Sequence, residues 1–404
     1  MKIELQRQID CIAGQVICAM LSLISRRNKT DRAQALPERI LVIMLSEMGS
    51  LVLAQPMFAW IRQRYPQARI YALLFEKNRE CLELFDSVSP KNILTVNADS
   101  LSALVKDSFR VLKKTRNLKI DTVIDCELFS RVSSIFSFLS GAETRVGFHP
   151  YTQEGLYRGT FINRPVLYNP YHHISRQFIT LAHAVNPEPN GRPTVKRNTE
   201  DDDLSLPRLN VRDEEIKTLR RRLMGDFPGI AEKKWVLLYP GGGLLPIRAW
   251  PVKNFCVVAE DLLKNGYGVG IIGLREDHGL ARKIASYLKD HPSCFDLTGY
   301  TRTVRELITL FHLASLLITN DGGPGHFASL TPIASIIFYG PETPVLYGPL
   351  GKNAVSLHVP LSCSPCLTAY NHRNSPCDGN NVCLKSISPE SVLRKAYEML
   401  HPST

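Results

Sequence analysis

Two hydrophobic patterns alternate along the chain from residue 39 onward. Short runs rich in β-branched residues are separated by longer stretches in which apolar residues recur at helical spacing. Strands that alternate with helices predict βαβ units and a parallel sheet. In the first half, strands are expected at 39–46, 68–75, 92–96, 121–125 and 143–148, with a first helix over 51–65.

The pattern is interrupted near the middle of the chain. Residues 186–210 are rich in proline, asparagine and charged residues, which predicts a linker between two domains. We place the limits of this linker at residues 186 and 212. Alternation then restarts, with strands expected at 235–239, 269–272, 316–319 and 335–339. A chain of 404 residues exceeds what one hydrophobic core usually organises. We therefore expect two doubly wound, Rossmann-like α/β domains, 34–185 and 213–404, facing a cleft.

The first 33 residues contain an apolar segment ahead of these domains. Residues 9–24 form an apolar run flanked by Arg7 on one side and by Arg26, Arg27 and Lys29 on the other. The run is shorter than the ~20 residues that span a bilayer, and no small-residue cleavage site follows it. It predicts a hydrophobic helix that packs on protein, on this chain or a second copy, or that lies in a membrane interface.

The composition of the chain limits which chemical classes of partner are expected. The net charge of +11 favours acidic partners such as phosphorylated sugars, nucleotides or anionic lipid surfaces. The basic residues are scattered rather than gathered in a stripe with aromatics, which argues against nucleic acid. The ten cysteines form no framework along the chain, as is typical of the reducing cytoplasm.

Glycine-rich loops follow several strands of the second half. The strand at 235–239 runs into Pro240 and the glycines Gly241, Gly242 and Gly243, with Arg248 downstream. Glycines let backbone N–H groups approach a phosphate closely, and an arginine adds a cation. The alternative is a plain strand-to-helix turn; the segment is neither a Walker loop nor a dinucleotide fingerprint.

A second loop follows the strand at 316–319. It contains Asp321 and His326 together with three glycines, Gly322, Gly323 and Gly325. Asp321 is either a ligand contact or a helix cap, and His326 is either a site residue or a core hydrogen-bonding group.

Two further loops complete the set. Glu342 follows the strand at 335–339 and suits a hydroxyl of a ribose or sugar, while 273–277 follows the strand at 269–272 and suits the border of a base. Four such loops at successive strand ends predict a nucleotide-sugar pocket.

Four segments of the chain resemble glycosyltransferase family nine, the ADP-heptose:lipopolysaccharide heptosyltransferases. They are ILVIMLSEMGSLVLAQP near the front, and YPGGG…RAWPVKNF, TNDGGPGHFASL and FYGPETPVLYGPLG in the second half. The resemblance covers roughly residues 39–400. It implies a two-lobed GT-B fold, an acceptor in the N-terminal lobe, a donor in the C-terminal lobe, and inverting transfer that needs no metal or other cofactor. It also implies that Arg248 holds the donor phosphates and that Asp321, Gly322, Gly323 and His326 line the donor.

The front loop, expected after the first strand, departs from the family pattern. Members usually read Gly-Asp after the first strand, and that aspartate is the expected general base; here the pair is Gly49-Ser50. A serine is a poor proton acceptor at pH 7. Glu47, in the same segment, is the first alternative base, and Asp125 and Glu127 after a neighbouring strand are the next. A chain with no base at all is the remaining alternative.

Cationic groups in the first half suit an acceptor that bears carboxylates or phosphates. The candidates are Arg131, Arg145, His149 and Arg176, with Arg158, His172 and His173 nearby in sequence.

Four cysteines gather in a loop-like segment near the C-terminus, 363–383. Their spacing, Cys363-x2-Cys366-x10-Cys377-x5-Cys383, suits a structural zinc ion without matching a standard finger or ribbon. Free or redox-paired thiols are the alternative.

The predicted function is therefore transfer of a sugar, heptose by family habit, from a nucleotide diphosphate to a lipopolysaccharide-core or related surface glycan. The expected place is the cytoplasm, with contact at the cytoplasmic face of the inner membrane. Two alternatives remain: a nucleotide-sugar-binding protein that has lost catalysis, and a GT-B-fold nucleotide-sugar epimerase. Binding without turnover by any acceptor, or product formed without an acceptor, separates them.

Overall fold

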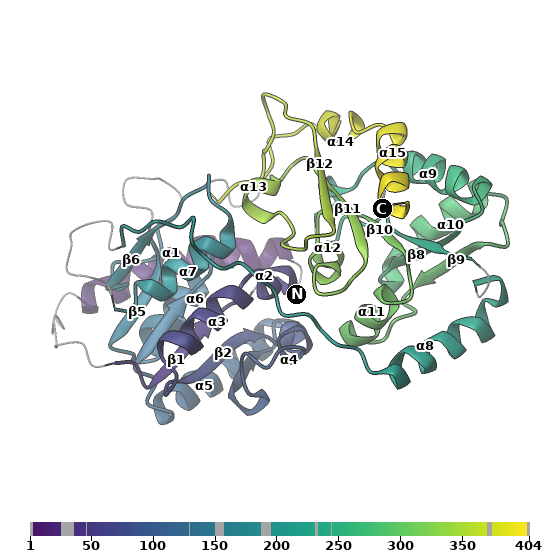
Figure 1. Ribbon diagram of the computed structural model, residues 1–404. Coiled ribbons are helices and arrows are strands. Elements are labelled where there is room, and N and C mark those ends of the chain that lie inside the picture. The colour runs from purple at the N-terminus through teal and green to yellow at the C-terminus, as the bar shows by residue number, and fades with distance from the viewer. Residues whose placement is uncertain are drawn as a thin grey trace. The chain divides into compact units, whose positions relative to one another are not determined.

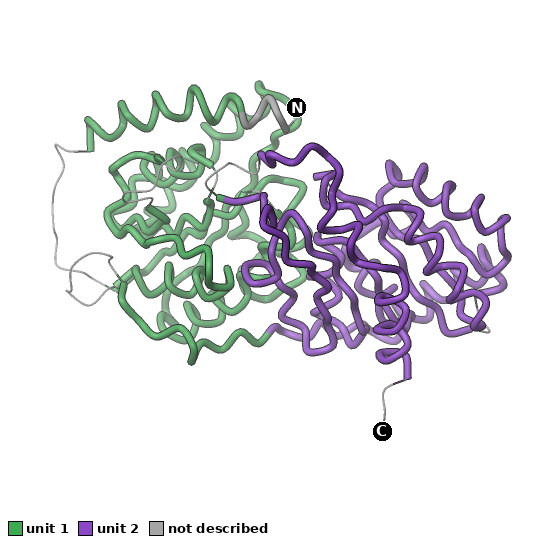
Figure 2. Tube along the Cα trace, turned by 90° about the horizontal axis from the view of Figure 1, so that it is seen from above, with its two compact units in different colours: residues 1–205, 369–373 green, residues 206–368, 374–404 purple. Residues whose placement is uncertain are grey.

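The computed structural model describes residues 3–25, 36–45, 47–128, 130–149, 157–186, 195–230, 233–243, 245–369 and 374–401. The chain divides into two compact units (Figure 2). Unit 1 comprises residues 1–205 with 369–373, and unit 2 comprises 206–368 with 374–404. Residues 187–194 of the predicted linker lie outside the described residues.

Unit 1 contains one six-stranded parallel sheet in the order β3-β2-β1-β4-β5-β6 (Figure 1). Its strands are β1 Arg39–Ile43, β2 Arg69–Phe75, β3 Ile93–Val96, β4 Thr122–Asp125, β5 Thr144–His149 and β6 Arg164–Leu167. Its helices are α1 Ile3–Ser25, α2 Met48–Leu53, α3 Gln55–Arg64, α4 Arg79–Glu83, α5 Leu101–Asn117, α6 Arg131–Leu139 and α7 Ile174–His183, with short 3₁₀ turns η1 Glu76–Asn78 and η2 Pro90–Asn92.

Both faces of this sheet are buried, as a parallel sheet requires. Leu41 and Ile43 of β1 pack with Val111 of α5 and Phe136 of α6 in one cluster. Because side chains alternate along a strand, Ile40 and Val42 point to the opposite face. These four side chains are nearly inaccessible to solvent.

Unit 2 contains a second six-stranded parallel sheet in the order β12-β11-β10-β7-β8-β9. Its strands are β7 Trp235–Tyr239, β8 Gly268–Gly273, β9 Cys294–Thr298, β10 Leu316–Asn320, β11 Ala334–Tyr339 and β12 Ala354–His358. Its helices are α8 Asp213–Asp226, α9 Val252–Lys264, α10 His278–Tyr287, α11 Val304–Phe311, α12 Gly323–Ala328, α13 Pro344–Tyr347, α14 Val382–Lys385 and α15 Pro389–Leu400, with 3₁₀ turns η3 Pro228–Ile230, η4 Pro246–Arg248 and η5 Arg275–Asp277.

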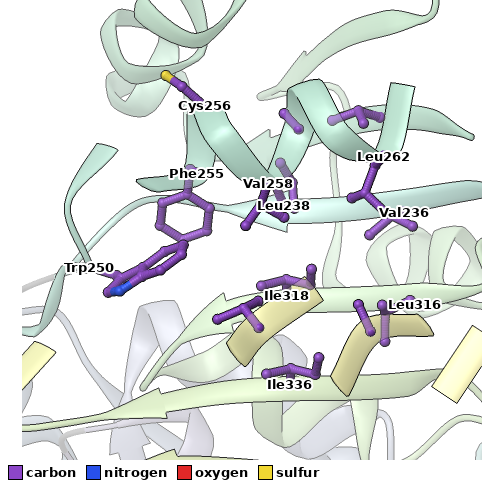
Figure 3. Close-up of a cluster of buried hydrophobic side chains, with 14 of the residues drawn as sticks. Val236, Leu238, Trp250, Phe255, Cys256, Val258, Leu262, Leu316, Ile318 and Ile336 are labelled. Carbon is purple, nitrogen blue, oxygen red and sulfur yellow. The ribbon is translucent and has the colours of Figure 1, made fainter. Parts of the chain in front are cut away.

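The core of unit 2 lies between the sheet and helices α9 and α15. Figure 3 shows Trp250 and Phe255 beside the aliphatic side chains of β7, β10 and β11. Trp250 is fully buried, and its Nε1 donates to the Ile387 carbonyl at 3.0 Å. The indole therefore ties the start of α9 to the segment before α15.

Each sheet has the doubly wound strand order 3-2-1-4-5-6 when its strands are renumbered from one. Strand order reverses between β1 and β4 in unit 1 and between β7 and β10 in unit 2. Ligands of such sheets bind at the carboxyl ends of the strands beside this reversal. The predicted fold class, two parallel-sheet α/β halves preceded by an apolar helix, is confirmed.

The strand and helix limits differ from the predictions in specific places. The strands β6, β9 and β12 were not predicted; all three are sheet edges with half-exposed or polar positions. The expected helix over 51–65 is two helices, α2 and α3, which meet at Ala54. Pro56 lies in the first turn of α3, where its missing N–H needs no partner.

Helix α1 is longer than the apolar run that predicted it. It has 23 residues, and its window Gln8–Ser25 is long and apolar enough to cross a membrane by length and composition. Only 17% of that window is buried. The basic residues Arg26, Arg27 and Lys29 that follow lie outside the described residues.

Candidate functional site

The first glycine loop follows β7 and needs its glycines for close packing. A Cβ on Gly242 would lie 2.8 Å from the Pro246 Cα, and a Cβ on Gly241 would lie 2.7 Å from Asp277 Oδ1. Gly243 has φ +57°, which favours glycine. The loop is therefore folded tightly on itself and against the loop after β8.

Asn320, at the end of β10, holds this loop in place. Its Oδ1 accepts from the Trp250 N–H at 2.8 Å, and its Nδ2 donates to the Gly241 carbonyl at 2.9 Å. The side chain is completely buried. This amide was not among the predicted site residues, although it stands directly before Asp321 in the TNDGG segment.

The next residue contributes to an ion-pair cluster around Arg248. The Arg248 Nη2 lies 2.9 Å from Glu342 Oε1, and its Nε lies 3.5 Å from Asp321 Oδ2. All three side chains are at most 12% exposed. The loops after β7, β10 and β11, well separated in sequence, thus bring their predicted charged residues together at the reversal of strand order.

The remaining residues of the second loop have different surroundings. Gly322 is extended backbone at the N-cap of α12, and a Cβ on Gly322 or Gly323 would meet only ordinary contacts. A Cβ on Gly325 would lie 3.0 Å from Ile337 Cγ1, so this glycine serves the packing of α12 on β11. His326 lies on α12 and is buried.

The fourth predicted loop, after β8, adjoins the first. Asp277 in η5 accepts from the Leu274 N–H at 2.8 Å and lies beside Gly241. Burial, with Asp277 nearby, raises the pKa of the Tyr239 hydroxyl to about 12.

The candidate bases lie at the corresponding strand ends of unit 1. Glu47 is the half-exposed N-cap residue of α2, in the short segment between β1 and that helix. Gly49 and Ser50 lie inside α2, not in a loop as predicted. Glu127, two residues after β4, accepts from the Leu45 N–H at 2.7 Å, which places its carboxylate at the end of β1 as well.

Asp125 occupies a different environment. It is fully buried, pairs with Arg158, accepts from Ser133 Oγ and accepts from the Glu127 N–H at 3.1 Å. Burial raises the pKa of this carboxyl to about 6, and the Arg158 guanidinium opposes the rise. These contacts give Asp125 a supporting position beneath Glu127.

The predicted acceptor cations differ in what their side chains contact. Arg131 is 2% exposed and contacts Asp10 of α1, and the guanidinium of Arg145 donates to the Phe161 and Ala142 carbonyls. Their side chains therefore serve packing within unit 1. His149 ends β5 and Arg176 lies in the first turn of α7, both half-buried.

The cysteines of 363–383 follow β12. Cys363 and Cys377 are exposed, Cys366 is half-buried, and Cys383 is buried beside Gly340. Residues 370–373 lie outside the described residues. Within the described part of the chain, no group of three or more His, Cys, Asp or Glu side chains is arranged to hold a metal ion. The structural zinc stays a prediction.

Comparison with known proteins identifies the family of this chain. The model of glycosyltransferase family 9 (heptosyltransferase) matches residues 108–375, more than half of the chain. The chain belongs to this family. The family-9 chain is accordingly a glycosyltransferase, as the sequence predicted.

Relatives of this family-9 chain cover most of its length. The lipopolysaccharide heptosyltransferase 2 of Salmonella typhimurium is 23% identical over 368 residues, which are 90% of this chain and 98% of the relative. The lipooligosaccharide heptosyltransferase 2 of Haemophilus ducreyi is 21% identical over 80% of this chain and 88% of its own.

Solved structures share the fold. The E. coli ADP-heptose lipopolysaccharide heptosyltransferase II superposes with a TM-score of 0.70 at 21% identity, covering 90% of this chain and 98% of that one. An E. coli heptosyltransferase solved with ADP superposes with a TM-score of 0.62 at 15% identity, covering 89% of this chain and 99% of that one.

Proposed function

We propose that this family-9 chain transfers a heptose from ADP-heptose to a lipopolysaccharide-core or related surface glycan, with inversion and without a catalytic metal. The observation that carries the proposal is the buried cluster of Arg248, Asp321 and Glu342 beside a glycine loop held by Asn320. The relatives named as heptosyltransferases and the neighbour solved with ADP support the choice of sugar and nucleotide.

The charges of this cluster suggest how a donor is held. One guanidinium faces two carboxylates, so the set alone does not attract a diphosphate. A bound donor brings hydroxyl groups that donate to carboxylates, and a diphosphate that competes for the guanidinium. In the proposal Arg248 turns to the diphosphate, while Asp321 and Glu342 accept from sugar or ribose hydroxyls.

The leaving diphosphate gains negative charge as its bond to the sugar breaks. Arg248 and the backbone N–H groups of the glycine loop are groups of the kind that stabilise such charge when positioned beforehand. They perform here the task for which some transferases use a metal ion.

The acceptor side needs one proton acceptor. The acceptor hydroxyl oxygen bonds to the anomeric carbon, the bond from that carbon to the diphosphate oxygen breaks, and the hydroxyl proton passes to a carboxylate. A single displacement of this kind inverts the anomeric centre. We assign the carboxylate to Glu47, because it is half-exposed at the end of β1, whereas Asp125 is enclosed and ion-paired.

The test is a transfer assay with the purified full chain. ADP-heptose is offered with lipopolysaccharide acceptors truncated at successive core sugars, in the presence and absence of EDTA, with UDP- and GDP-sugars as competitors. Mass spectrometry is expected to show one added heptose, and NMR an inverted anomeric configuration, unchanged by EDTA. Donor binding with no product from any acceptor favours the binding protein, and an altered nucleotide sugar without acceptor favours the epimerase; either result overturns the proposal.

The cysteine segment carries a separate proposal, a structural zinc ion held by Cys363, Cys366, Cys377 and Cys383. Their thiol chemistry and spacing support it. Elemental analysis of the purified chain is expected to find about one zinc per chain and less after Cys377→Ser. Absence of zinc in protein purified without chelators contradicts it.

A further inference from the structure

Helix α1 is attached to unit 1 by one narrow stripe of small and polar residues. Asp10, Gly14, Cys18 and Ser22 recur every four positions, and the last three are buried, with Asp10 half-buried. Residues four apart lie on one face of a helix, so this stripe runs along the helix. A Cβ on Gly14 would lie 2.9 Å from the Arg131 Cβ, which shows how closely the helix approaches α6.

Hydrogen bonds secure both ends of this stripe. The Asp10 carboxylate accepts from the Arg131 N–H at 2.8 Å and the Val132 N–H at 2.9 Å, which are unpaired donors in the first turn of α6. The Ser22 hydroxyl accepts from the Thr160 N–H at 2.9 Å and contacts the Tyr157 hydroxyl at 3.2 Å. Helix α1 therefore lies along unit 1 over most of its length, at the edge of the unit (Figure 2).

The opposite face of α1 is wide, apolar and exposed. Its large side chains are between 41% and 71% exposed: Ile12, Val16, Ile17, Met20, Leu23 and Ile24. This distribution is the reverse of an ordinary surface helix, which turns its apolar face inward. Contiguous exposed apolar surface of this kind marks an interaction site.

The way in which α1 is attached distinguishes a helix that spans a membrane from one that lies flat in its interface. A spanning helix is surrounded by lipid or by other spanning helices, whereas Asp10 and Ser22 bind α1 sideways to a water-soluble α/β unit. While these hydrogen bonds persist, only the outward apolar side of α1 can contact a membrane. That side fits the interface plane of a membrane, where an apolar face enters the boundary between headgroups and acyl chains.

Charge favours lipid over a second copy of the chain. The apolar run 9–24 contains no Lys or Arg, whereas Arg7, Arg26, Arg27 and Lys29 flank it in sequence, and cations beside an apolar face attract anionic headgroups.

We propose that α1 is an in-plane membrane anchor that seats its outward face, centred on Ile12, Val16 and Met20, in a bilayer with anionic headgroups while its Asp10–Ser22 stripe stays bound to unit 1. The anchor is independent of the transfer reaction, so its test uses binding to lipid alone.

Vesicle flotation of the purified full chain tests the anchor. The chain is expected to float with phosphatidylethanolamine–phosphatidylglycerol vesicles, less with phosphatidylcholine vesicles, and less at high salt because exposed charges are screened. Ile12→Glu with Met20→Glu is expected to weaken binding at least about tenfold. Phe109→Glu is the matched control, because Phe109 of α5 is 71% exposed, as Ile12 is, and its variant should bind as the parent does.

Three results overturn the anchor. In the first, the double variant floats like the parent while its thermal unfolding shows that it is folded. In the second, sedimentation shows a parental dimer that the double variant converts to monomer, which assigns the face to a second copy. In the third, the parent stays in the bilayer after an alkaline carbonate wash, which indicates a spanning helix. Ile12→Ala, a smaller change, should give an intermediate loss if the face enters lipid.

Discussion

Arg248 and Glu342 lie 94 positions apart in the chain, yet their side chains form an ion pair with Nη2 and Oε1 2.9 Å apart. The pair joins η4, after β7, to the loop after β11, and Asp321 contacts the same guanidinium from the loop after β10. One side chain therefore links three loops, and its charge is the positive member of a net negative cluster.

Removal of Arg248 should damage transfer more than folding. Arg248→Ala is expected to lower kcat/KM for the donor by ~10²–10³, because the leaving diphosphate loses a positioned cation. Steady-state kinetics with varied ADP-heptose measure the effect. Arg222→Ala is the control, since Arg222 also pairs with a carboxylate of unit 2, Glu306, at 3.0 Å, but lies on α8. Equal losses in the two variants contradict the role given to Arg248.

A methyl group at Gly242 should disturb the donor loop. Gly242→Ala places a Cβ 2.8 Å from the Pro246 backbone, so the loop must move. We expect donor affinity to fall about tenfold or more by calorimetry, a loss of at least about 1.4 kcal/mol. At Gly279 of α10 an added Cβ meets nothing within 4 Å, and Gly279→Ala should leave binding unchanged and stabilise the chain by up to about 1 kcal/mol. Unchanged affinity in Gly242→Ala would remove the loop from the donor site.

Loss of the hydrogen-bond donor of the Asn320 side chain should by itself weaken both the fold and the binding of the sugar donor. Asn320→Asp keeps an acceptor for the Trp250 N–H but places a carboxylate against the Gly241 carbonyl. Leaving buried polar groups unsatisfied costs about 1–3 kcal/mol, so the free energy of unfolding should fall by that amount and donor affinity should fall with it. Chemical denaturation measures the free energy of unfolding. Asn265→Asp, at an exposed residue of the same unit that also donates to a carbonyl, should leave donor affinity unchanged.

These contacts show why much of the fold was predictable from sequence. Strands β1, β7 and β10 lie inside parallel sheets and are buried on both faces, so they appear as uninterrupted apolar runs. The edge strands β6, β9 and β12 have neighbours on one side only, and Pro165 within β6 is tolerated there. Their patterns resemble those of loops, and only the pairing partner identifies them.

The site was predictable to a similar extent. Glycines and charges at strand ends indicated Arg248, Asp321 and Glu342, but not that both carboxylates contact one guanidinium. The long-range partners of Arg131 could not be inferred either: its contact with Asp10 depends on where α1 packs, 121 positions away. Asn320 was not predicted: an asparagine at a strand end is usually a turn residue, and only the fold shows what its amide holds.

The buried Asp125 predicts a pH dependence of stability. Burial raises its pKa to about 6 in the folded chain, above the ordinary value near 4, so the folded state binds more protons between these values. The contribution of this group is therefore complete below about pH 4 and is lost as the pH rises through about 6. Asp125→Asn has no titrating group at this position, so the stability of the parent relative to the variant should decline over that interval. Denaturation at several pH values measures it, and a parallel course of the two proteins contradicts the shift.

The assignment of the base rests on the contrast between Glu47 and Glu127 at the end of β1. Glu47→Gln is expected to lower kcat by ~10²–10⁴ while donor affinity and thermal stability stay unchanged. Glu127→Gln is the matched control, because an amide oxygen still accepts from the Leu45 N–H, so its kcat should fall far less. Adding Ser50→Asp to Glu47→Gln should restore part of the rate, since residue 50 lies in the first turn of α2, directly after Glu47. A large loss in Glu127→Gln with an active Glu47→Gln moves the base to Glu127. Full activity in both variants removes both carboxylates from proton transfer.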